Sequence, residues 1–277
     1  GKTLLPGFHD PHIHLRKVGQ FRTTMLDLRG VSSIDEMKEK MVEFSKNLAP
    51  DQWLLARGYN EETLAEDRHP TKEDLDEVSP DRPAWLIRTC AHIAVCNTKA
   101  LEVAGITDNV SVPSGGVAHK DDRGKLIGRF EETALGLVGN HIPTPTLQEF
   151  KDMIVAAHED LLKTGVTSAT DPAVLPELME AYRALNHENG LLMPTNVMAI
   201  RRPDGGSITV PLPELVDTEN LKINTIKLFS DGGLSGATAA MSQNYIGMKS
   251  RGVLRLNAKE IYDLSFQAVE KGFQVGT

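Results

Sequence analysis

The stretch LLPGFHDPHIHL, residues 4–15, places His12 and His14 on either side of a single isoleucine. Its apolar start ends at a proline–glycine break and polar residues follow, which is typical of a buried strand that leads into a loop. On a strand, residues two apart point to the same side, so both imidazoles could reach one ion, whereas on a helix they could not. Because the chain contains nine histidines, the spacing needs support from the surrounding sequence.

Composition limits the class of protein. The 277 residues are 40% hydrophobic and 25% charged, as in a soluble globular protein of one large or two small domains. A net charge of −8, with scattered lysines and arginines, argues against a nucleic-acid partner. Cys90 and Cys96 favour reduced thiols in a cytoplasmic protein. No apolar stretch approaches the roughly 20 residues that cross a bilayer, and we expect no signal peptide. We expect Gly1 and Thr277 to be cuts through a larger protein.

From residue 146 onward, helical and strand patterns alternate. Thr146 and Glu149 have the spacing of a capping box and begin one helix. A second helix is expected over 175–190, and a third from Asn257 to Gly272. Strands are expected at 166–171, 194–200, 223–232 and 273–276. This order predicts right-handed βαβ units around a parallel sheet, which on closing would form a (β/α)8 barrel with its chemistry at the carboxyl ends of the strands.

Residues 19–145 do not follow this alternation. They contain a helix that begins at Ser33, where Glu36 completes the spacing of a capping box. Strands are expected at 53–60 and 84–90, a helix at 97–104 and a hairpin turn at 120–125. We therefore expect an α/β fold with three parts: the first barrel strand and ligand loop in 1–18, an α+β insertion in 19–145, and the second to fifth barrel strands in 146–277.

Lys227 is a second unusual position. It lies in INTIKLF, residues 223–229, a pattern that would be buried on both faces in a barrel. A charged lysine there costs several kcal/mol unless it is paired or neutralised. The side chain could extend to an edge, or its pKa could fall so that the neutral amine reacts with CO2 to form a carbamate. The two oxygens of a carbamate could bridge two cations.

Several stretches together resemble the amidohydrolase superfamily. LPGFHDPHIHL (5–15) resembles the first barrel strand of that superfamily, which usually reads PGFxDxHxH. GVTSATD (165–171) is similar to the second strand, and IKLF (226–229) looks like the strand that bears a carbamylated lysine. The inserted stretch 58–101 and KLFSDGGLSGATAA (227–240) resemble the branch that includes N-substituted formamide deformylase. The resemblance covers essentially the whole chain.

The resemblance implies a metal site. His12 and His14 match the first-strand ligands of the more buried metal, and Lys227 matches the bridging ligand when it is carbamylated. The family also implies a histidine after the fifth strand, another after the sixth and a general-base aspartate after the eighth. The given sequence stops at Thr277, where the fifth-strand histidine should follow. It also lacks the small β-sandwich domain that the family builds from both termini.

Three further side chains are candidates for the site. His92 matches a histidine typical of this branch and is expected near the substrate, while the alternative is a histidine satisfied at a strand end. Asp171 ends the second strand with the parity to face the barrel mouth and contact substrate, or else it caps a helix before Pro172. Asp231 could approach the metal site as a catalytic residue, or it fixes the glycine turn that follows.

The remaining polar candidates favour structural roles. Glu131 could line the pocket, although a solvated hairpin position is the simpler interpretation. His158 lies among apolar helix positions and is expected to be structural. A glycine-rich loop follows Lys227 and contains Gly232, Gly233 and Gly236. No Lys-Ser/Thr pair follows it, so we expect close backbone approach to a substrate or metal and not a phosphate cradle.

We therefore expect a metal-dependent hydrolase that cleaves an amide-like C–N bond in a small molecule by metal-activated water. One or two divalent ions would serve, zinc being the first choice, although iron and manganese suit the same ligands. A deaminase of the same superfamily is the alternative within enzymes. The alternative outside enzymes is a silent barrel portion whose open edges and exposed apolar face bind a ligand or partner. No nucleic-acid or membrane partner is expected, and a homo-oligomer is allowed.

Overall fold

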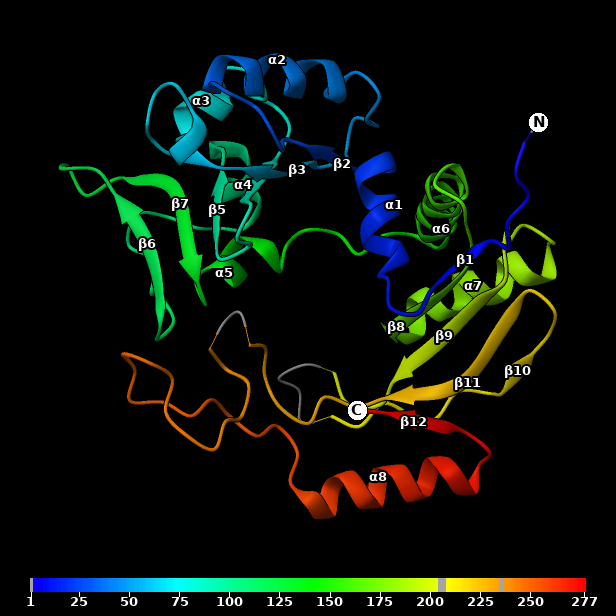
Figure 1. Ribbon diagram of the computed structural model, residues 1–277. Coiled ribbons are helices and arrows are strands. Elements are labelled where there is room, and N and C mark those ends of the chain that lie inside the picture. Colours follow the sequence, from blue (N-terminus) through cyan, green and yellow to red (C-terminus); the bar gives the residue numbers. More distant parts are fainter. Residues whose placement is uncertain (1, 204–207, 235–236) are drawn as a thin grey trace. The chain divides into compact units, whose positions relative to one another are not determined.

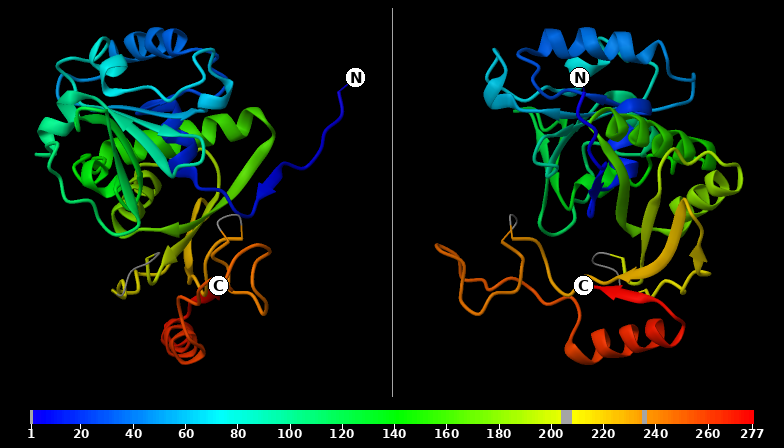
Figure 2. Two further views of the ribbon diagram at one scale, coloured as in Figure 1. Left: turned by 90° about the vertical axis from the view of Figure 1, so that its left-hand side faces the viewer. Right: turned by 45° about the vertical axis from the view of Figure 1, so that its right-hand side comes forward.

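The computed structural model describes residues 2–203, 208–234 and 237–277. The chain forms two compact units: unit 1 comprises Gly1–Gly19 with Thr146–Thr277, and unit 2 comprises Gln20–Pro145. Helices and strands occur in both units (Figures 1 and 2), so the expected α/β class is confirmed. None of the helices in the described ranges combines the length and the apolar character needed to cross a membrane.

Unit 1 is built on a mainly parallel sheet. Five strands pair side by side in chain order, all parallel: β1 (Phe8–Asp10), β8 (Val166–Val174), β9 (Thr195–Ile200), β11 (Leu221–Lys227) and β12 (Gln274–Gly276). The short β10 (Val216–Asp217) pairs antiparallel with β11. The helices between its strands are α6 (Leu147–Lys163), α7 (Pro176–His187) and α8 (Ala258–Glu270), and the unit also contains the first part of α1 (Leu15–Thr23), which continues into unit 2. The expected alternation of strands and helices is therefore confirmed.

Two helices of unit 1 begin as predicted. At α6, Glu149 N donates to Thr146 Oγ1, while Thr146 N donates to Glu149 Oε2 at 2.7 Å, which completes the capping box. Asn257 and Glu260 form the same reciprocal pair at α8. These bonds satisfy amides that have no partner inside the helix, so local sequence fixes both starting points.

The two faces of this sheet differ in character. Ala169 and Val197 belong to a hydrophobic core that also contains residues of α6 and α7. Neighbouring positions on the strands point the other way and carry polar groups. There, the His9 ring lies 2.8 Å from Ser168 Oγ through Nδ1 and 3.3 Å from Thr170 Oγ1 through Nε2. A polar contact thus joins β1 to β8 on the face opposite the helices.

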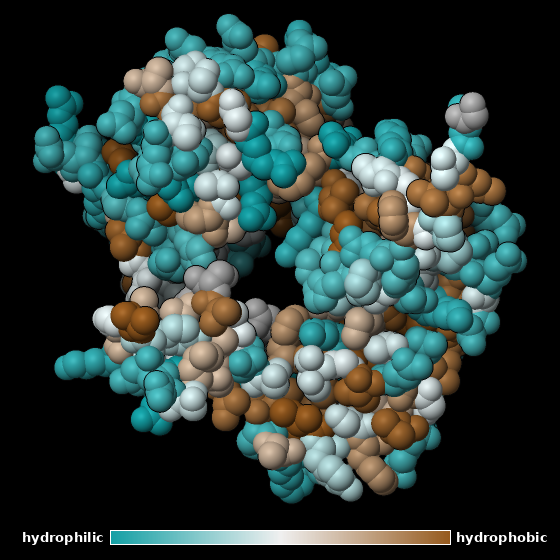
Figure 3. All heavy atoms as spheres, in the orientation of Figure 1, coloured by the Kyte–Doolittle hydropathy of each residue, from teal (hydrophilic) through white to brown (hydrophobic). Residues whose placement is uncertain are grey.

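Helix α8 carries apolar side chains on two sides. Leu264 and Ala268 are buried, whereas Tyr262, Phe266 and Val269 are exposed, and the Tyr262 and Phe266 rings stack with centroids 5.9 Å apart. Hydrophobic residues also reach the surface around this helix in Figure 3. Exposed positions at i, i+4 and i+7 form one helix face, so α8 presents an apolar stripe away from its core.

Unit 2 is an α+β arrangement. Its sheet has the order β2 (Met25–Asp27), β3 (Leu54–Tyr59), β4 (Ala84–Arg88), β5 (Ile93–Cys96), β7 (Leu126–Glu132) and β6 (Gly116–Lys120). β2, β3 and β4 are parallel and the remaining pairs antiparallel. Its helices are α2 (Ile34–Ser45), the 3-10 turn η1 (Glu61–Thr63), α3 (Lys72–Asp76), α4 (Thr98–Val103) and α5 (Leu135–Gly139). The expected helix near 97–104 and the hairpin turn at 120–125 are both present.

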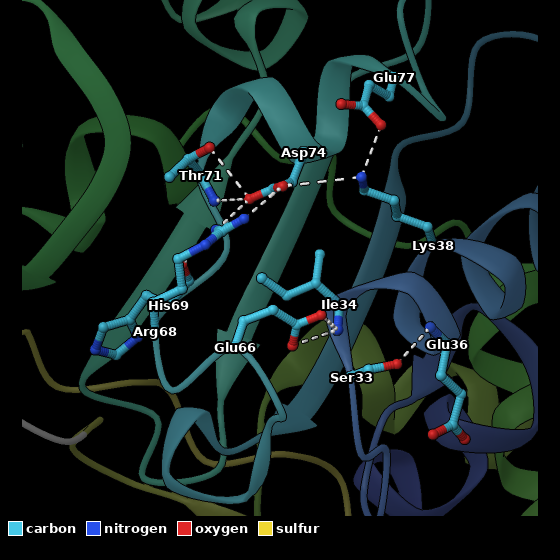
Figure 4. Close-up of polar contacts among 10 residues, drawn as sticks. All are labelled: Ser33, Ile34, Glu36, Lys38, Glu66, Arg68, His69, Thr71, Asp74 and Glu77. Carbon is cyan, nitrogen blue, oxygen red and sulfur yellow. Dashed lines mark hydrogen bonds and ion pairs between the residues drawn. The ribbon is translucent and has the colours of Figure 1, made fainter.

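The start of α2 differs from the prediction. Ser33 Oγ accepts from Glu36 N at 3.0 Å, as a cap should, but the Glu36 carboxylate accepts from Ser32 N and Oγ, at 2.8 and 2.9 Å. The predicted reciprocal capping box with Ser33 is therefore wrong by one residue. Glu66, from the following loop, instead accepts from Ile34 N with both carboxylate oxygens at 3.1 Å (Figure 4).

A buried carboxylate fixes that loop. Asp74 accepts from both terminal nitrogens of Arg68, at 2.7 and 3.0 Å, and from Thr71 N at 2.8 Å (Figure 4). Lys38 Nζ lies 3.8 Å away. Burial raises the pKa of Asp74, but the bonds from Arg68 and Thr71 outweigh this and lower it overall. Asp74 thus holds the loop against α3 as a charged acceptor.

Candidate metal centre

The two motif histidines lie beyond the first strand. β1 ends at Asp10, and residues 11–14 connect it to α1 without regular structure. The assumption that strand periodicity places His12 and His14 is therefore wrong. Hydrogen bonds hold the segment instead: Asp10 Oδ1 accepts from His12 N at 3.0 Å, and Ile13 N donates to Thr170 O on β8 at 3.0 Å. The two imidazoles are nevertheless neighbours, with centroids 5.6 Å apart in an edge-to-face arrangement.

His14 immediately precedes α1 and is held at both its backbone and its ring. Its carbonyl accepts from Lys17 N at 2.9 Å and Val18 N at 3.2 Å, which opens the helix. Its Nδ1 lies 3.8 Å from Asp171 Oδ1, an attractive contact longer than a hydrogen bond. The His14 side chain keeps 40% of its surface exposed. With Nδ1 toward Asp171, the opposite ring nitrogen, Nε2, is the one available to a ligand.

Asp171 is buried behind His14, with 2% of its surface exposed. Tyr182 on α7 donates its hydroxyl to Oδ2 at 2.7 Å, and the backbone N–H of Leu15 is a further donor. Because β8 continues to Val174 and the carboxylate contacts Tyr182 of α7, the expectation that Asp171 ends its strand and faces the barrel mouth is wrong. So is the capping alternative, because Leu175 occupies the N-cap of α7. Contact between Asp171 and a substrate stays a prediction.

The electrostatics around Asp171 follow from burial. Burial raises its pKa, while the nearby His14 ring, the hydrogen bond from Tyr182 and the Leu15 amide oppose that rise. The pKa of Tyr182 is also raised, by burial first and then by the adjacent carboxylate, so its hydroxyl remains a proton donor. Burial lowers the pKa of Arg16 and the charge of Asp171 opposes this, which places a guanidinium within the carboxylate's field.

Lys227 is the last residue of β11. It pairs with Ile200 on β9 and Gly276 on β12, so it lies at the carboxyl end of the parallel sheet. Its side chain is half-buried, and Nζ lies 5.3 Å from the centroid of the Phe229 ring, within cation–π range. In the described ranges no carboxylate forms an ion pair with it. This environment fits both alternatives for Lys227, a charged side chain that extends to the sheet edge and a neutral amine that forms a carbamate. Carbamylation stays a prediction.

Asp231 organises the loop after β11. Its Oδ2 accepts from Ala240 N at 2.8 Å, and it forms an isolated antiparallel bridge with Leu254. A Cβ on Gly232 would lie 2.4 Å from Thr238 O, so glycine is required there by a close backbone approach within the loop. These contacts support the turn-fixing alternative, and a catalytic role for Asp231 stays a prediction. Gly236 lies outside the described residues.

His92 and Glu131 belong to unit 2 and are described within it. His92 Nδ1 lies 3.1 Å from Glu132 Oε2, on a side chain that is 62% exposed. Glu131 is half-buried and its Oε1 lies 2.6 Å from His119 Nε2, so the expectation of a solvated hairpin position is wrong. A substrate-binding role for His92 stays a prediction.

Sequence reasoning placed His158 correctly and missed Tyr182. His158 is fully buried in α6, with Nε2 3.1 Å from Thr195 Oγ1 on β9, which confirms its structural position. Tyr182 occupies the apolar face of α7 with Leu178 and Leu185. A tyrosine in such a stripe needs a hydrogen-bond partner for its hydroxyl, and this requirement is the sequence signal that indicates a buried polar contact at Tyr182.

The residues present fit part of a metal site. Zinc takes about four ligands, and imidazole nitrogen is among those it prefers. His12 and His14 are adjacent, and the orientation of His14 leaves one ring nitrogen available. Within residues 2–203, 208–234 and 237–277, no group of three or more His, Cys, Asp or Glu side chains is arranged to hold an ion. The pair therefore suits two ligand positions of a larger set.

Comparison with known proteins extends this picture. The profile of the Amidohydrolase family matches residues 1–277. YtcJ of Bacillus subtilis is 29% identical over 99% of this chain and 52% of its own length. N-substituted formamide deformylase of Arthrobacter pascens is 27% identical over 99% of this chain and 53% of its own. The crystal structure of an uncharacterized metal-dependent hydrolase from Pyrococcus horikoshii OT3 superposes with a TM-score of 0.76 at 26% identity, covering 98% of this chain and 52% of that protein. The chain thus spans about half the length of the curated relatives it matches.

Proposed function

We propose, from the premise that this chain belongs to the amidohydrolase family, that it forms part of a metal-dependent hydrolase of amide-like C–N bonds in small molecules. One observation carries the proposal: two neighbouring imidazoles lie just beyond the carboxyl end of a strand in a parallel sheet, and one is backed by a buried carboxylate. Chemistry in barrels of parallel strands is located at that end. We further propose that unit 1 supplies the first five strands of a (β/α)8 barrel and that unit 2 is an insertion after the first strand.

Each candidate residue has a proposed role in holding the ion or in the reaction. His12 and His14 would hold the ion through ring nitrogens, and Asp171 would keep the His14 ring turned toward it. Lys227, as a neutral amine, would add to CO2 and release a proton to form a bridging carbamate. A bound divalent ion, with zinc as first choice, acidifies water and polarises the substrate carbonyl. Asp231 is proposed near the reaction and His92 near the substrate.

The substrate class is also a proposal. One relative is named N-substituted formamide deformylase, which favours N-formyl and N-acyl compounds as first substrates to test. Two free thiols, Cys90 and Cys96, are compatible with the proposed cytoplasmic location. Neither nucleic acid nor a membrane enters the proposal as a partner.

The test uses the full-length protein. We expect it to bind metal and to release amine from N-formyl or N-acyl compounds, and we expect the His12→Ala, His14→Ala double variant to lose both properties. His187→Ala, which removes an exposed histidine, is the matched control. Stoichiometric metal retained by the double variant would end the assignment of the ligands. Release of ammonia from heterocycles with no amide hydrolysis would favour the deaminase alternative.

Lys227 has its own test. Native mass spectrometry in bicarbonate should show the extra mass of CO2 on the wild-type protein and not on Lys227→Arg. An unmodified Lys227 in the wild-type protein under these conditions would support the alternative in which the charged side chain extends to the sheet edge.

A further inference from the structure

We propose that Tyr182 acts through Asp171 to position the His14 imidazole as a metal ligand. The inference rests on the proposed function and assigns a role to a residue of α7 that is distant in sequence from the histidine pair. Tyr182 would be a positioning residue, because it contacts Asp171 and not the ion or the substrate.

Tyr182 is completely buried between α7 and the sheet, where phenylalanine would fill almost the same volume without a polar group to desolvate. Burying a hydroxyl costs free energy unless it makes a hydrogen bond. Its bond to Asp171 Oδ2, at 2.7 Å, is short and directed to a carboxylate. The hydroxyl therefore belongs to a specific polar contact inside an apolar core.

The groups that Asp171 faces include His14 Nδ1, at 3.8 Å, and the Leu15 amide. His14 ends the segment that joins β1 to α1, where the histidine pair lies, and Leu15 is the first residue of α1. The strand that carries Asp171 is itself irregular: Ala173 adopts φ of 60°, and pairing with β9 shifts register between Asp171 and Val174. Bulges of this kind redirect side chains next to functional sites.

A carboxylate facing Nδ1 favours the tautomer in which Nδ1 carries the proton and the Nε2 lone pair is free, the arrangement found where carboxylates support histidine ligands. The start of α1 fixes the backbone of His14, so Asp171 restrains the remaining side-chain rotation. Within the described ranges, no side-chain hydrogen bond is recorded for the His12 ring. The two ligands are therefore unequal, and His14 is the pre-oriented one.

The test measures zinc affinity of the full-length protein by competition with a chelator. Loss of a partner that orients a ligand typically weakens metal binding by about 10–100-fold. We expect Asp171→Asn to fall within this range and Tyr182→Phe near its lower end, about 10-fold. Thr195→Val is the control: it removes a buried hydrogen bond to His158 in the same unit and should leave zinc affinity unchanged. Thermal unfolding of all three variants reports how much stability each has lost.

A second readout needs no metal. The nitrogen-15 chemical shifts of the His14 ring in the metal-free protein, recorded at a pH where it is neutral, should show the Nδ1–H tautomer in wild type. Asp171→Asn and Tyr182→Phe should increase the share of the other tautomer, and Thr195→Val should not. A purely structural hydrogen bond between α7 and β8 would change stability without this shift.

The outcomes separate the two proposals. If wild type binds zinc and both variants bind it equally tightly, the positioning role is refuted and the proposed function stands. An Nε2–H tautomer in wild type, or equal weakening by Thr195→Val, refutes the positioning role as well. If wild type binds no metal through His12 and His14, the proposed function fails and this inference fails with it.

Discussion

Acid should destabilise unit 1 through His158, and the structure gives both the sign and the size of the effect. Thr195 Oγ1 donates to Met193 O at 3.2 Å, so it accepts from His158 Nε2–H at 3.1 Å. The second ring nitrogen, Nδ1, is buried without a hydrogen-bond partner among the described residues. Protonation would therefore place a charge and a new N–H where no acceptor lies. Burial accordingly lowers the pKa of His158 from 6.5 to about 4.

The magnitude follows from linkage. The lowered pKa means that the unfolded chain binds the proton more tightly than the folded chain does. The folded state therefore has its full stability above pH 6.5 and loses stability as the pH falls from 6.5 to about 4. The lowering from 6.5 to about 4 corresponds to about 3 kcal/mol of unfolding free energy over the whole window. About 2 kcal/mol of that is lost by pH 5.

Urea unfolding of the metal-free full-length protein at pH 7, 6 and 5 measures this loss. His158→Gln keeps a donor for Thr195 and cannot titrate, so the difference in unfolding free energy between wild type and variant should shift by about 2 kcal/mol from pH 7 to pH 5. His187→Gln, at an exposed position, should follow wild type. Parallel curves for wild type and His158→Gln across this range would refute the reasoning.

Three further variants test local features. Thr146→Ala removes the N-cap of α6 and should cost about 1 kcal/mol in urea unfolding, whereas an unchanged midpoint would show that the cap is dispensable. Gly19→Ala would place a Cβ 1.7 Å from Met153 O, so we expect a loss of about 1–3 kcal/mol or more, and an unchanged melting temperature would contradict the close approach. Asp74→Asn weakens the acceptor of Arg68 and should cost about 1–3 kcal/mol, together with faster proteolysis of the loop before α3; wild-type resistance would show that other contacts hold it.

The elements of unit 1 were predictable because their signals are local. Thr146 with Glu149 is a pattern of four residues, and its hydrogen bonds involve only those residues. The same reasoning failed at Ser33, where the spacing was equally good. There, the carboxylate of Glu66, from a later loop, accepts from Ile34 N at the helix start, and Glu36 accepts from Ser32. A contact from a distant part of the chain decided between two local arrangements, and the four-residue pattern carries no information about it.

The candidate site shows the same limit. Strand periodicity predicts that the rings of His12 and His14 are neighbours, and they are, although the strand ends at Asp10 and its periodicity does not place them. What holds the pair is a set of contacts across the fold: Thr170 binds the backbone between them, and Asp171 faces one ring. Two adjacent residues of β8 thus support one ligand segment. An HxH motif therefore indicates candidate ligands from sequence, whereas the contacts of each ring depend on the strand beside the motif, where Asp171 faces His14 and in turn accepts a hydrogen bond from Tyr182.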